Sequence, residues 1–419
     1  MSLESIDEYS PWEASRAAQL SAAVAAARRA ASIGRYQAEW GSLGITSNTI
    51  DAGSWASIPF LTKDKLVEAA REAPPYGNRL GVPKERVAHA FAAPGPLYMP
   101  FTTQDMDRVA GSFAKALASC GLQAGDLVDQ TTMYNWVIAA TVLDRALEKI
   151  GCGIVPGGIG QSDRHLDVIE GLGINAILAF PTFLEHLLEQ AAAAGRRLPL
   201  RKAAVMGELH DPRTKQRIHD AHGVLVREFY GTADVGAVAW ECAAGNGMHL
   251  RDDLLVEFVS PGLTQPVEPE SGTPVELVVT DLHRQAMPII RLRTGDLIDG
   301  LESAPCSCGR TSPRFKRIVG RAGEITKVKG MFVVPRLVVD VMQKENLERP
   351  FRLVVERSKG GIDQLTLEIS GAPYADAPAF LAKVEAALRI RLAIQFVPQL
   401  PEGAPRLVDR RFQTRAMKP

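Results

Sequence analysis

The sequence has few cysteines, no excess of charge of either sign and no long apolar run. Its 419 residues include five cysteines, an odd and small number that argues against a disulfide framework. Lys and Arg together number 48, as do Asp and Glu, so no net field draws nucleic acid or an anionic membrane to the surface. No apolar run approaches the roughly 20 residues of a membrane span, and the start SLESIDEYS lacks the basic and apolar regions of a signal peptide. We therefore expect a soluble, cytoplasmic protein without a nucleic-acid or membrane partner.

The hydrophobic pattern predicts an α/β fold. Between Asp126 and Tyr230, short apolar runs alternate with helical segments of about 10–15 residues, which indicates parallel βαβ units. Residues 248–297 are more extended and rich in turns, and we interpret them as a β-rich subdomain. Ligands of such folds bind beyond the carboxyl ends of the parallel strands. Candidate site residues are therefore sought in the turns that follow those strands.

Chain length indicates two domains, because 419 residues exceed one ordinary hydrophobic core. We predict a large N-terminal domain, residues 1–321, and a small α+β domain, residues 322–419. The boundary falls in Met287–Pro335, which has three parts. An apolar strand delivers Asp296 in a turn (RTGDL), a close cysteine pair follows (CSCGR), and a Gly-Arg precedes alternating apolar residues (GRAGEITKVKG). Together they suggest a nucleotide site, a metal site and a hinge.

Several segments resemble one family, the phenylacetate–CoA ligase branch of the adenylate-forming (acyl-CoA synthetase-like) enzymes. IPFLTKDKLVEA resembles the family's PFTTKEDL, and FYGTADVG resembles YGLSEVMG. AMPIIRLRTGDL resembles AMPVIRYRTGDL, and RIVGRAGEITKVKGMFVVP resembles RIVGRSDDMLIIRGVNVFP. The resemblance runs from about Ile58 to the C-terminus, and the order and spacing of the segments argue against a chance match.

The resemblance implies the adenylate-forming fold and the activity of an acid–thiol ligase. These enzymes activate an aryl carboxylate with ATP and Mg²⁺, form acyl-AMP and pyrophosphate, and pass the acyl group to the thiol of CoA. The expected small-molecule partners are therefore ATP or AMP with magnesium, CoA, and an aryl acid or its acyl thioester. The resemblance also implies that the large N-terminal domain binds acyl group and nucleotide and that the small domain is mobile.

The resemblance also implies a nucleotide site. Asp296 matches the acceptor of the ribose hydroxyls, a role that suits a carboxylate with two oxygens, and Arg321 matches an arginine that reaches the same ribose. Tyr230, Gly231 and Thr232 match the turn that stacks on adenine and contacts phosphate. Each residue also has a simpler interpretation: Asp296 as a surface aspartate in a turn, Arg321 as part of a solvent-facing ion pair, and Tyr230 as a core tyrosine.

The candidate catalytic residues are Asp234 and Glu208. Asp234 stands where the family has a glutamate that helps to hold Mg²⁺, and Glu208 follows Gly207 in a turn resembling Gly-Ala-Glu-Pro beside the acyl pocket. The alternative for Asp234 is a capping residue. In relatives, the aryl pocket is lined by a segment that corresponds here to Tyr134, Asn135 and Trp136. The alternative is that these aromatic side chains belong to the core.

Four side chains indicate a structural zinc site: Cys242, His249, Cys306 and Cys308. Three thiolates and one imidazole make a closed tetrahedral ligand set, and shorter members of the family resemble this pattern. The Cys-x-Cys spacing is tighter than the usual separation of roughly two to four residues. The alternative is two unrelated sites of reduced cysteine and a surface histidine, and we favour zinc.

The sequence departs from the family on the phosphate side of the site. Where relatives have a loop such as SSGTTGKPT, this chain has HAFAAPGPL, without the hydroxyls and the lysine, and Pro94 and Pro96 have no N–H to donate. The lysine of the family's EGK segment corresponds to Ala404, and the hinge acid corresponds to Gly323. The ribose and adenine half of the site is therefore preserved, whereas the phosphate half is degenerate.

Three functions are compatible with this pattern. The first is an aryl-carboxylate–CoA ligase with atypical phosphate handling, which the resemblance favours. The second is ATP-independent acyl transfer from a pre-activated thioester. The third is a non-catalytic relative that acts as a binding or partner subunit. A homodimer is also compatible with the sequence.

Overall fold

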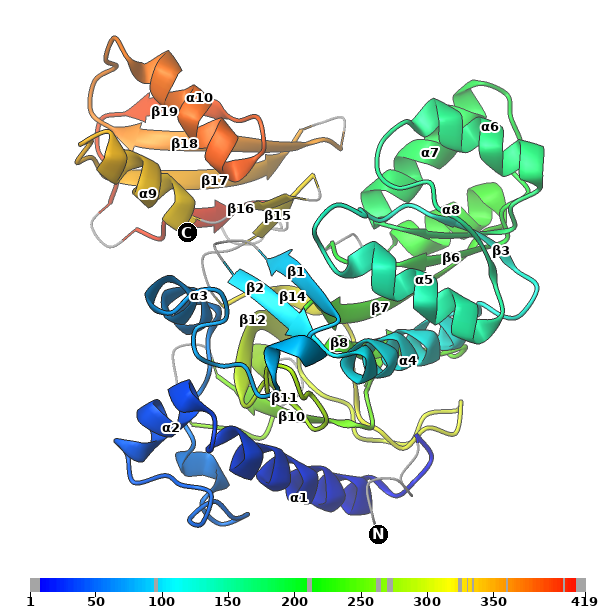
Figure 1. Cartoon of the computed structure of the whole chain (residues 1–419). Coiled ribbons are helices and arrows are strands. Elements are labelled where there is room, and N and C mark those ends of the chain that lie inside the picture. The colour runs from blue at the N-terminus through cyan, green and yellow to red at the C-terminus, as the bar shows by residue number, and fades with distance from the viewer. Residues whose placement is uncertain are drawn as a thin grey trace. The chain divides into compact units, whose positions relative to one another are not determined.

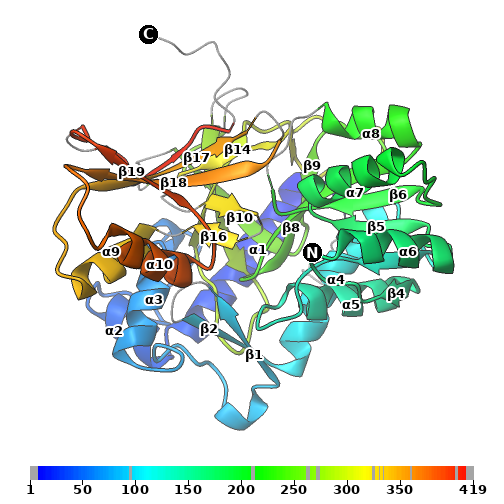
Figure 2. The same cartoon turned by 90° about the horizontal axis from the view of Figure 1, so that it is seen from above.

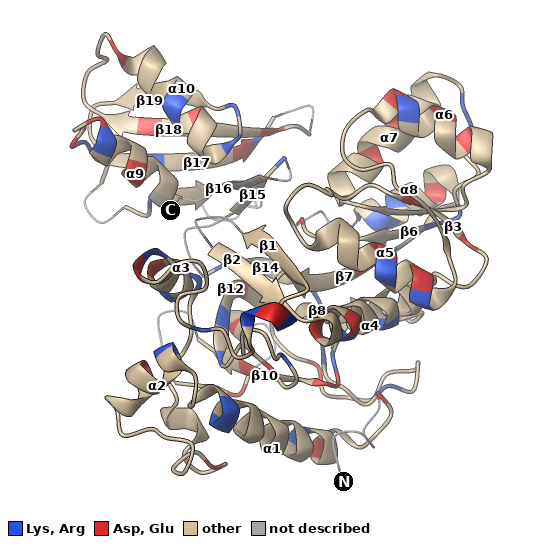
Figure 3. Cartoon of the chain, viewed as in Figure 1, with Lys and Arg blue, Asp and Glu red and all other residues tan. Residues whose placement is uncertain are grey.

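The structure is a computed structural model in which the chain divides into two compact units, Met1–Gly320 (unit 1) and Arg321–Pro419 (unit 2) (Figure 1). Lys and Arg are interspersed with Asp and Glu along the helices, as the balanced composition leads one to expect (Figure 3). The structure describes residues 8–93, 97–208, 213–260, 265–269, 274–322, 326–329, 331–333, 335–358, 361–401 and 404–411.

An eight-stranded mixed sheet forms the centre of unit 1 (Figure 1 and Figure 2). From one edge to the other, its strands are β13 (Arg314–Phe315), β9 (Met248–Leu250), β8 (Gly236–Glu241), β7 (Leu225–Thr232), β6 (Lys202–Val205), β5 (Ala176–Ala179), β3 (Leu127–Gln130) and β4 (Gly153–Val155). The strands from β7 to β4 pair in parallel, whereas β8, β9 and β13 add antiparallel strands. Both edge strands are short.

Helices cover both faces of this sheet. They are α4 (Thr103–Ser119), α5 (Ala139–Ile150), α6 (Ser162–Leu172), α7 (Pro181–Ala193) and α8 (Thr214–His222). Successive side chains of a strand point to opposite faces, and in β5 Leu178 packs in the core of α4 and α5, whereas Ile177 packs in the core of α6, α7 and α8. Parallel sheets of this kind are buried on both sides. The predicted α/β fold is confirmed.

A second sheet and an N-terminal helical layer complete unit 1. The sheet contains β10 (Leu254–Val259), β11 (Pro274–Asp281), β12 (Leu292–Asp299) and β14 (Ile318–Arg321), in that order, and corresponds to the predicted β-rich subdomain. Helix α1 (Trp12–Ala30) buries an alanine face, including Ala23 and Ala27, in one cluster with Leu255 of β10. Two short helices follow, α2 (Gly34–Gly41) and α3 (Lys63–Glu72), and then the antiparallel hairpin of β1 (His89–Ala93) and β2 (Leu97–Phe101).

Unit 2 is a small α+β domain. Its sheet has the order β19 (Ala393–Val397), β18 (Asp363–Ser370), β17 (Phe351–Arg357) and β20 (Leu407–Asp409). The hairpin of β15 (Thr326–Val328) and β16 (Met331–Val333), helix α9 (Pro335–Lys344) and helix α10 (Ala377–Leu388) contribute to one apolar cluster with this sheet. Among the helices that the structure describes, none combines the length and the apolarity that crossing a membrane requires.

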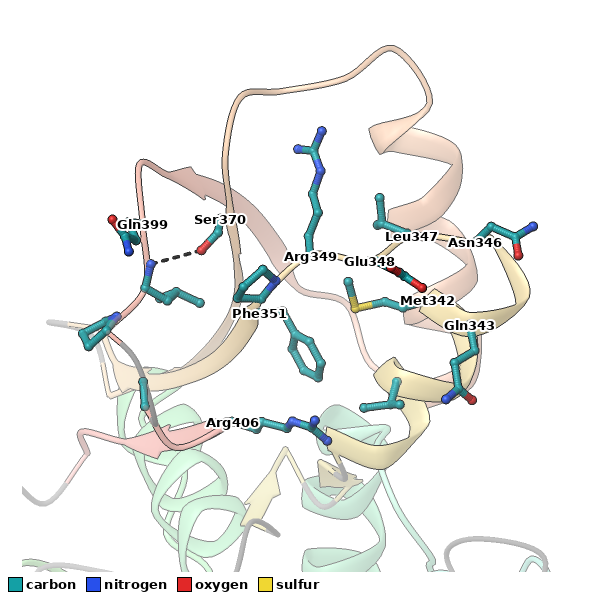
Figure 4. A pocket seen from close by; sticks show the side chains of 15 residues that line it. Met342, Gln343, Asn346, Leu347, Glu348, Arg349, Phe351, Ser370, Gln399 and Arg406 are labelled. Atoms are coloured by element: carbon teal, nitrogen blue, oxygen red, sulfur yellow. Dashed lines mark hydrogen bonds between the residues drawn. The ribbon is translucent and has the colours of Figure 1, made fainter.

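A cavity of about 730 Å³ lies within unit 2, between the end of α9 and the first residue of β17 (Figure 4). Met342 and Phe351 give it an apolar lining, and Arg406 lies along one side. Ala404, which corresponds to the family's lysine, also lines this cavity.

Asp105 caps α4 and provides a test of the fold. Its carboxylate accepts hydrogen bonds from the backbone N–H groups of Thr102 (2.9 Å), Gln285 (2.8 Å) and Ala286 (3.0 Å). The substitution Asp105→Ala leaves these donors unpaired in a buried region, and we expect the free energy of unfolding to fall by about 3 kcal/mol. Urea unfolding followed by tryptophan fluorescence measures this loss, because all five tryptophans lie in unit 1.

The control for this experiment is Asp107→Ala on the same helix. Asp107 forms an exposed ion pair with Lys149, so its loss should cost less than about 1 kcal/mol. Equal losses in the two variants would contradict the assigned role of Asp105.

Candidate active site and metal centre

Tyr230 and Asp296, the residues predicted for adenine and ribose, are in direct contact. The hydroxyl of Tyr230 at the end of β7 donates to Oδ2 of Asp296 in β12 over 2.6 Å, and both side chains are buried. Asp296 lies inside β12 and not in a turn after a strand, so that part of the prediction is wrong. The reason is a β-bulge: the pairing register with β11 shifts beside Asp296, and Gly295 adopts a φ of 77°.

Asp234 follows β7 and forms an ion pair that the sequence did not reveal. Nζ of Lys63 lies 2.6 Å from Oδ1 and 2.7 Å from Oδ2 of Asp234, whose side chain is 2% exposed. Lys63 is the first residue of α3 and belongs to IPFLTKDKLVEA, a segment in which we had assigned no functional residue. The carboxylate predicted to hold Mg²⁺ therefore faces an ammonium group.

Gly231 and Thr232 continue from Tyr230 to Asp234. A Cβ atom on Gly231 would lie 2.9 Å from the carbonyl oxygen of Gly236 and 3.0 Å from the ring of Phe113, so only glycine fits. Thr232 accepts a weak hydrogen bond from the N–H of Val235 (3.4 Å). The close packing at Gly231 and the ion pair of Asp234 fix the path of this turn at the carboxyl end of β7.

Arg284 fixes the same turn from the opposite side. Its guanidinium donates to the carbonyl oxygens of Asp234 (2.8 Å) and Pro100 (2.9 Å) and lies 3.5 Å from the centre of the Phe101 ring. Pro100 and Phe101 belong to β2 of the β1–β2 hairpin, where the resemblance leads us to expect the phosphate loop. Arg284 therefore joins the Asp234 turn to this hairpin, a role that no pattern in the sequence indicates.

Some of the predicted residues lie outside the described part of the chain. Pro94 and Pro96 of the hairpin and Gly323 of the hinge are among them. Arg321 is described: it is the last residue of β14 and the first of unit 2, and its side chain is half-buried.

The residues predicted for the acyl pocket lie at the carboxyl ends of β3 and β6. Glu208, which follows the exposed Gly207, accepts hydrogen bonds from the hydroxyl (2.5 Å) and the N–H (3.3 Å) of Thr182 in the first turn of α7. The N-terminus of a helix stabilises such a carboxylate. The hydroxyl of Tyr134 lies 3.0 Å from both carboxylate oxygens of Asp144. Burial raises the pKa of Tyr134, and the hydrogen bond to Asp144 raises it further.

Asn135 and Trp136 differ from Tyr134 in their surroundings. Asn135 is exposed, and Trp136 exposes 76% of its surface. Trp136 also has a φ of 66°, which is rare for a bulky residue, and its carbonyl oxygen accepts from the N–H of Ala92 (2.9 Å). The structure therefore places Tyr134 in a hydrogen-bonded network and Trp136 at the surface of unit 1.

The four predicted metal ligands come together although they lie in two distant segments. One ligand atom from each of Cys242, His249, Cys306 and Cys308 lies within 4.8 Å of the others. The Sγ atoms of Cys242 and Cys306 are 3.7 Å apart, and Sγ of Cys308 is 3.6 Å from Nε2 of His249. Sulfur atoms about 2.3 Å from one tetrahedral ion lie about 3.8 Å apart, so the cluster has the dimensions of a metal site.

The imidazole of the cluster is in the state that a metal ion requires, whereas the thiol of Cys242 must lose its proton when a metal binds. Nδ1 of His249 donates to the carbonyl oxygen of Ser312 (3.0 Å), which leaves Nε2 for the metal. Burial lowers the pKa of His249 and keeps the imidazole neutral. Burial raises the pKa of Cys242 to about 11. Burial opposes ionisation of Cys308 as well, but hydrogen bonds from the backbone and side chain of Arg310 outweigh it and lower the pKa of that thiol.

Comparisons with known proteins agree with the resemblance seen in the sequence. The chain is 29% identical to a phenylacetate-coenzyme A ligase of Thermus thermophilus over 323 residues, which are 74% of this chain and 71% of that protein. It is 27% identical to the corresponding ligase of Aromatoleum evansii over 332 residues, which are 77% of this chain and 73% of that protein. No family model matches the chain. The predicted resemblance to the phenylacetate–CoA ligase branch is confirmed.

A solved structure confirms the fold. The crystal structure of 2-hydroxyisobutyryl-CoA ligase in complex with 2-HIB-AMP and CoA superposes with a TM-score of 0.86 and 23% identity. The superposition covers 96% of this chain and 91% of that one. The chain therefore has the fold of the adenylate-forming CoA ligases.

A double-mutant cycle tests the ion pair between Lys63 and Asp234. Lys63→Met leaves a buried carboxylate without its cation, and we expect a loss of about 2 kcal/mol in the free energy of unfolding. This value is below that of a fully buried pair, because Lys63 is 34% exposed. Adding Asp234→Asn should recover at least about half of the loss, since no buried charge remains.

The control is Lys65→Met on the same helix, an exposed lysine that donates to the carbonyl oxygen of Phe60 over 2.9 Å. This variant should change the stability by less than about 0.5 kcal/mol. If the losses from Lys63→Met and Asp234→Asn simply add, the two side chains do not act as a pair.

Proposed function

We propose that this protein is an acid–thiol ligase that joins a carboxylic acid to CoA through an acyl-adenylate. The contact between Tyr230 and Asp296 carries the proposal, because it joins the adenine-side and ribose-side residues of one nucleotide site. The relatives are phenylacetate-coenzyme A ligases, and the similar solved structure holds an acyl-AMP and CoA. We extend the same class of substrates to this chain, with an aryl acid as the acyl donor.

The reaction has two steps. A carboxylate oxygen of the acid attacks the α-phosphorus of ATP, and pyrophosphate leaves with the electrons of the broken P–O bond. The sulfur of CoA then attacks the acyl carbonyl carbon, the acyl–oxygen bond breaks, and AMP and the thiol proton are released. The proposal includes a change in the orientation of unit 2 between the two steps, about a hinge that comes after Arg321.

Asp296 and Tyr230 hold the nucleoside in this proposal. A carboxylate accepts hydrogen bonds from the 2′- and 3′-hydroxyls of ribose together, which fixes the sugar and with it the position of the α-phosphate. The hydroxyl of Tyr230 orients the carboxylate through the 2.6 Å hydrogen bond. Gly231 and Thr232 lead from this pair to the phosphate side, where the turn meets Asp234.

The phosphate side does not fit a magnesium ion as the residues are arranged. Both oxygens of Asp234 contact Nζ of Lys63, at 2.6 Å and 2.7 Å, so this ammonium group already occupies the side of the carboxylate where a cation would bind both oxygens. A magnesium ion would have to displace Lys63, and we assign no step to it. Lys63 instead places an ammonium group at the turn after β7, where Asp234 balances its charge.

The acyl side of the site is assigned to the residues at the ends of β3 and β6. Glu208, held by Thr182, orients the turn at Gly207 beside the acyl group. Tyr134, held by Asp144, forms a polar wall with Asn135 next to it. Trp136 borders the same wall from the surface of unit 1.

A second candidate function has its own supporting observation. The lysine that relatives hold over the reacting acyl-phosphate corresponds to Ala404, and the hairpin sequence HAFAAPGPL lacks hydroxyls and lysine. These losses favour an enzyme that accepts an already activated thioester and transfers its acyl group without ATP. The first proposal keeps priority because the nucleoside residues are retained.

Formation of AMP and acyl-CoA from ATP, CoA and a panel of aryl carboxylic acids tests the first proposal. At least one acid should support turnover, and Asp296→Ala should lower kcat/KM for ATP about 100-fold, because a charge-assisted pair of hydrogen bonds is lost. Glu302→Ala, an exposed residue shortly after β12, is the control and should retain activity. Acyl exchange between thioesters without ATP would support the second candidate, and the absence of both activities would contradict both.

We propose zinc as the metal of the Cys242 cluster, in a structural role. Three thiolates and one imidazole leave no open coordination position, and bound zinc would cross-link the two segments that supply the ligands. Protein purified in reducing buffer without added metal should carry about one zinc ion per chain by elemental analysis.

The variants Cys306→Ser and Cys308→Ser should each bring the zinc content below about half an ion per chain, because each removes a thiolate ligand. Cys152→Ser is the control, since Cys152 lies outside the cluster. A zinc content below about half an ion in the unmodified protein would contradict the assignment.

A further inference from the structure

The first described residues of the chain are bound to the loop that carries Cys306 and Cys308. The N–H of Thr311 donates to the carbonyl oxygen of Glu8 over 3.1 Å, and the Thr311 hydroxyl donates to the carbonyl oxygen of Ser10. A Cβ atom on Gly309 would lie 3.5 Å from the ring of Tyr9. Residues separated by about three hundred positions in the sequence thus share one small contact area at the metal centre.

Arg310 connects a metal ligand to this N-terminal segment. Its Nη1 donates to Sγ of Cys308 over 3.6 Å, and its Nε donates to Oε2 of Glu8 over 2.9 Å. The guanidinium also lies 6.0 Å from the centre of the Tyr9 ring. One planar side chain therefore contacts a thiol sulfur, a carboxylate and an aromatic face.

The side chain of Glu8 is mostly buried and contacts Arg310. Its side chain is 16% exposed, and its second oxygen, Oε1, is buried without a hydrogen-bond partner in the described chain. Burying a carboxylate in this way is costly unless a cation stays beside it. Arg310 is the cation that lies there, so any change in the position of Arg310 acts on Glu8.

We propose that the metal site extends beyond its four ligands to Arg310 and Glu8, and that metal binding thereby fixes the N-terminal segment 8–10 on unit 1. This inference rests on the proposed metal site. Arg310 acts as a positioning residue that orients a ligand, and Glu8 couples that residue to the N-terminus. The segment leads directly into α1, which packs on β10.

The charges explain why the metal and the segment are coupled. Three thiolates and a divalent ion carry a net charge of about −1, which a neighbouring guanidinium balances. Nη1 of Arg310 lies 3.6 Å from Sγ of Cys308, so the guanidinium is in place to donate to a metal-bound thiolate. The ion also cross-links the Cys306–Cys308 loop to the segment that carries Cys242, and this cross-link holds Arg310 and Thr311 in place.

Metal affinity in reducing buffer, measured by competition with a chelator, tests the first half of this inference. Arg310→Gln should weaken zinc binding about 10- to 100-fold, and Arg310→Lys should recover part of the loss because the charge is kept. The visible spectrum of the Co²⁺ form should keep its thiolate charge-transfer bands in Arg310→Gln, which separates a weakened site from a misfolded one. Arg317→Gln, an exposed residue nearby, is the control. An unchanged affinity in Arg310→Gln would overturn the assigned role.

Hydrogen exchange of the full-length protein tests the second half. The Thr311 amide, which donates to Glu8, should exchange slowly in the zinc-loaded protein and at least about tenfold faster after zinc removal. Cleavage by chymotrypsin after Tyr9 should accelerate in parallel. Glu8→Gln should give fast exchange with zinc still bound, whereas Glu13→Gln, an exposed residue of α1, should not.

The possible failures can be told apart. If exchange at Thr311 is the same with and without zinc, the coupling is wrong although the zinc site stands. If the protein neither contains nor takes up zinc, the proposed metal site fails and this inference fails with it. Neither result affects the proposed ligase activity, which is measured separately.

Discussion

A buried guanidinium must find acceptors for its hydrogen bonds, and in Arg284 this requirement organises the candidate active site. The side chain is 4% exposed, and it donates to the turn that carries Asp234 and to the hairpin strand that ends in Phe101. These segments are far apart in the sequence, and each is too short to hold its own shape. The polar groups of the site are thus positioned by a residue that need not touch a substrate, as in other sites built on a supporting shell.

The retained and the lost parts of the proposed nucleotide site follow different physical rules. Tyr230 and Asp296 come from strands within packed sheets, so their positions depend on the hydrophobic core and change only with the fold. The phosphate side depends on hydroxyls and backbone N–H groups of a loop. A small number of substitutions is enough to remove these groups. The pairing of Lys63 with Asp234 places an ammonium group at this side, and the carboxylate of Asp234 balances its charge. The residues proposed to hold the nucleoside are therefore present although the loop no longer resembles that of the relatives.

The sequence predicted strands and ligand clusters correctly where one local pattern of residues determines them. Alternating runs predicted the parallel strands, and the cysteine pair with Cys242 and His249 predicted ligands that do lie together. It failed where the partners are distant and individually unremarkable: Lys63 and Asp234 are separated by 171 positions, and neither stands out by composition. The bulge at Gly295 was missed because a glycine before an aspartate is also the pattern of a turn. Pairs of this kind become visible only when the fold brings the segments together.

The two edges of the eight-stranded sheet determine how easily a strand of another chain can add to it. A sheet edge presents unpaired N–H and C=O groups to which another chain can add a strand. Here β13 has 2 residues and β4 has 3, whereas β7 has 8. A passing strand would find room for only a few hydrogen bonds at either edge, too few to offset the entropy of its ordering. The short edge strands of the eight-stranded sheet thus disfavour the addition of a further strand at these two edges.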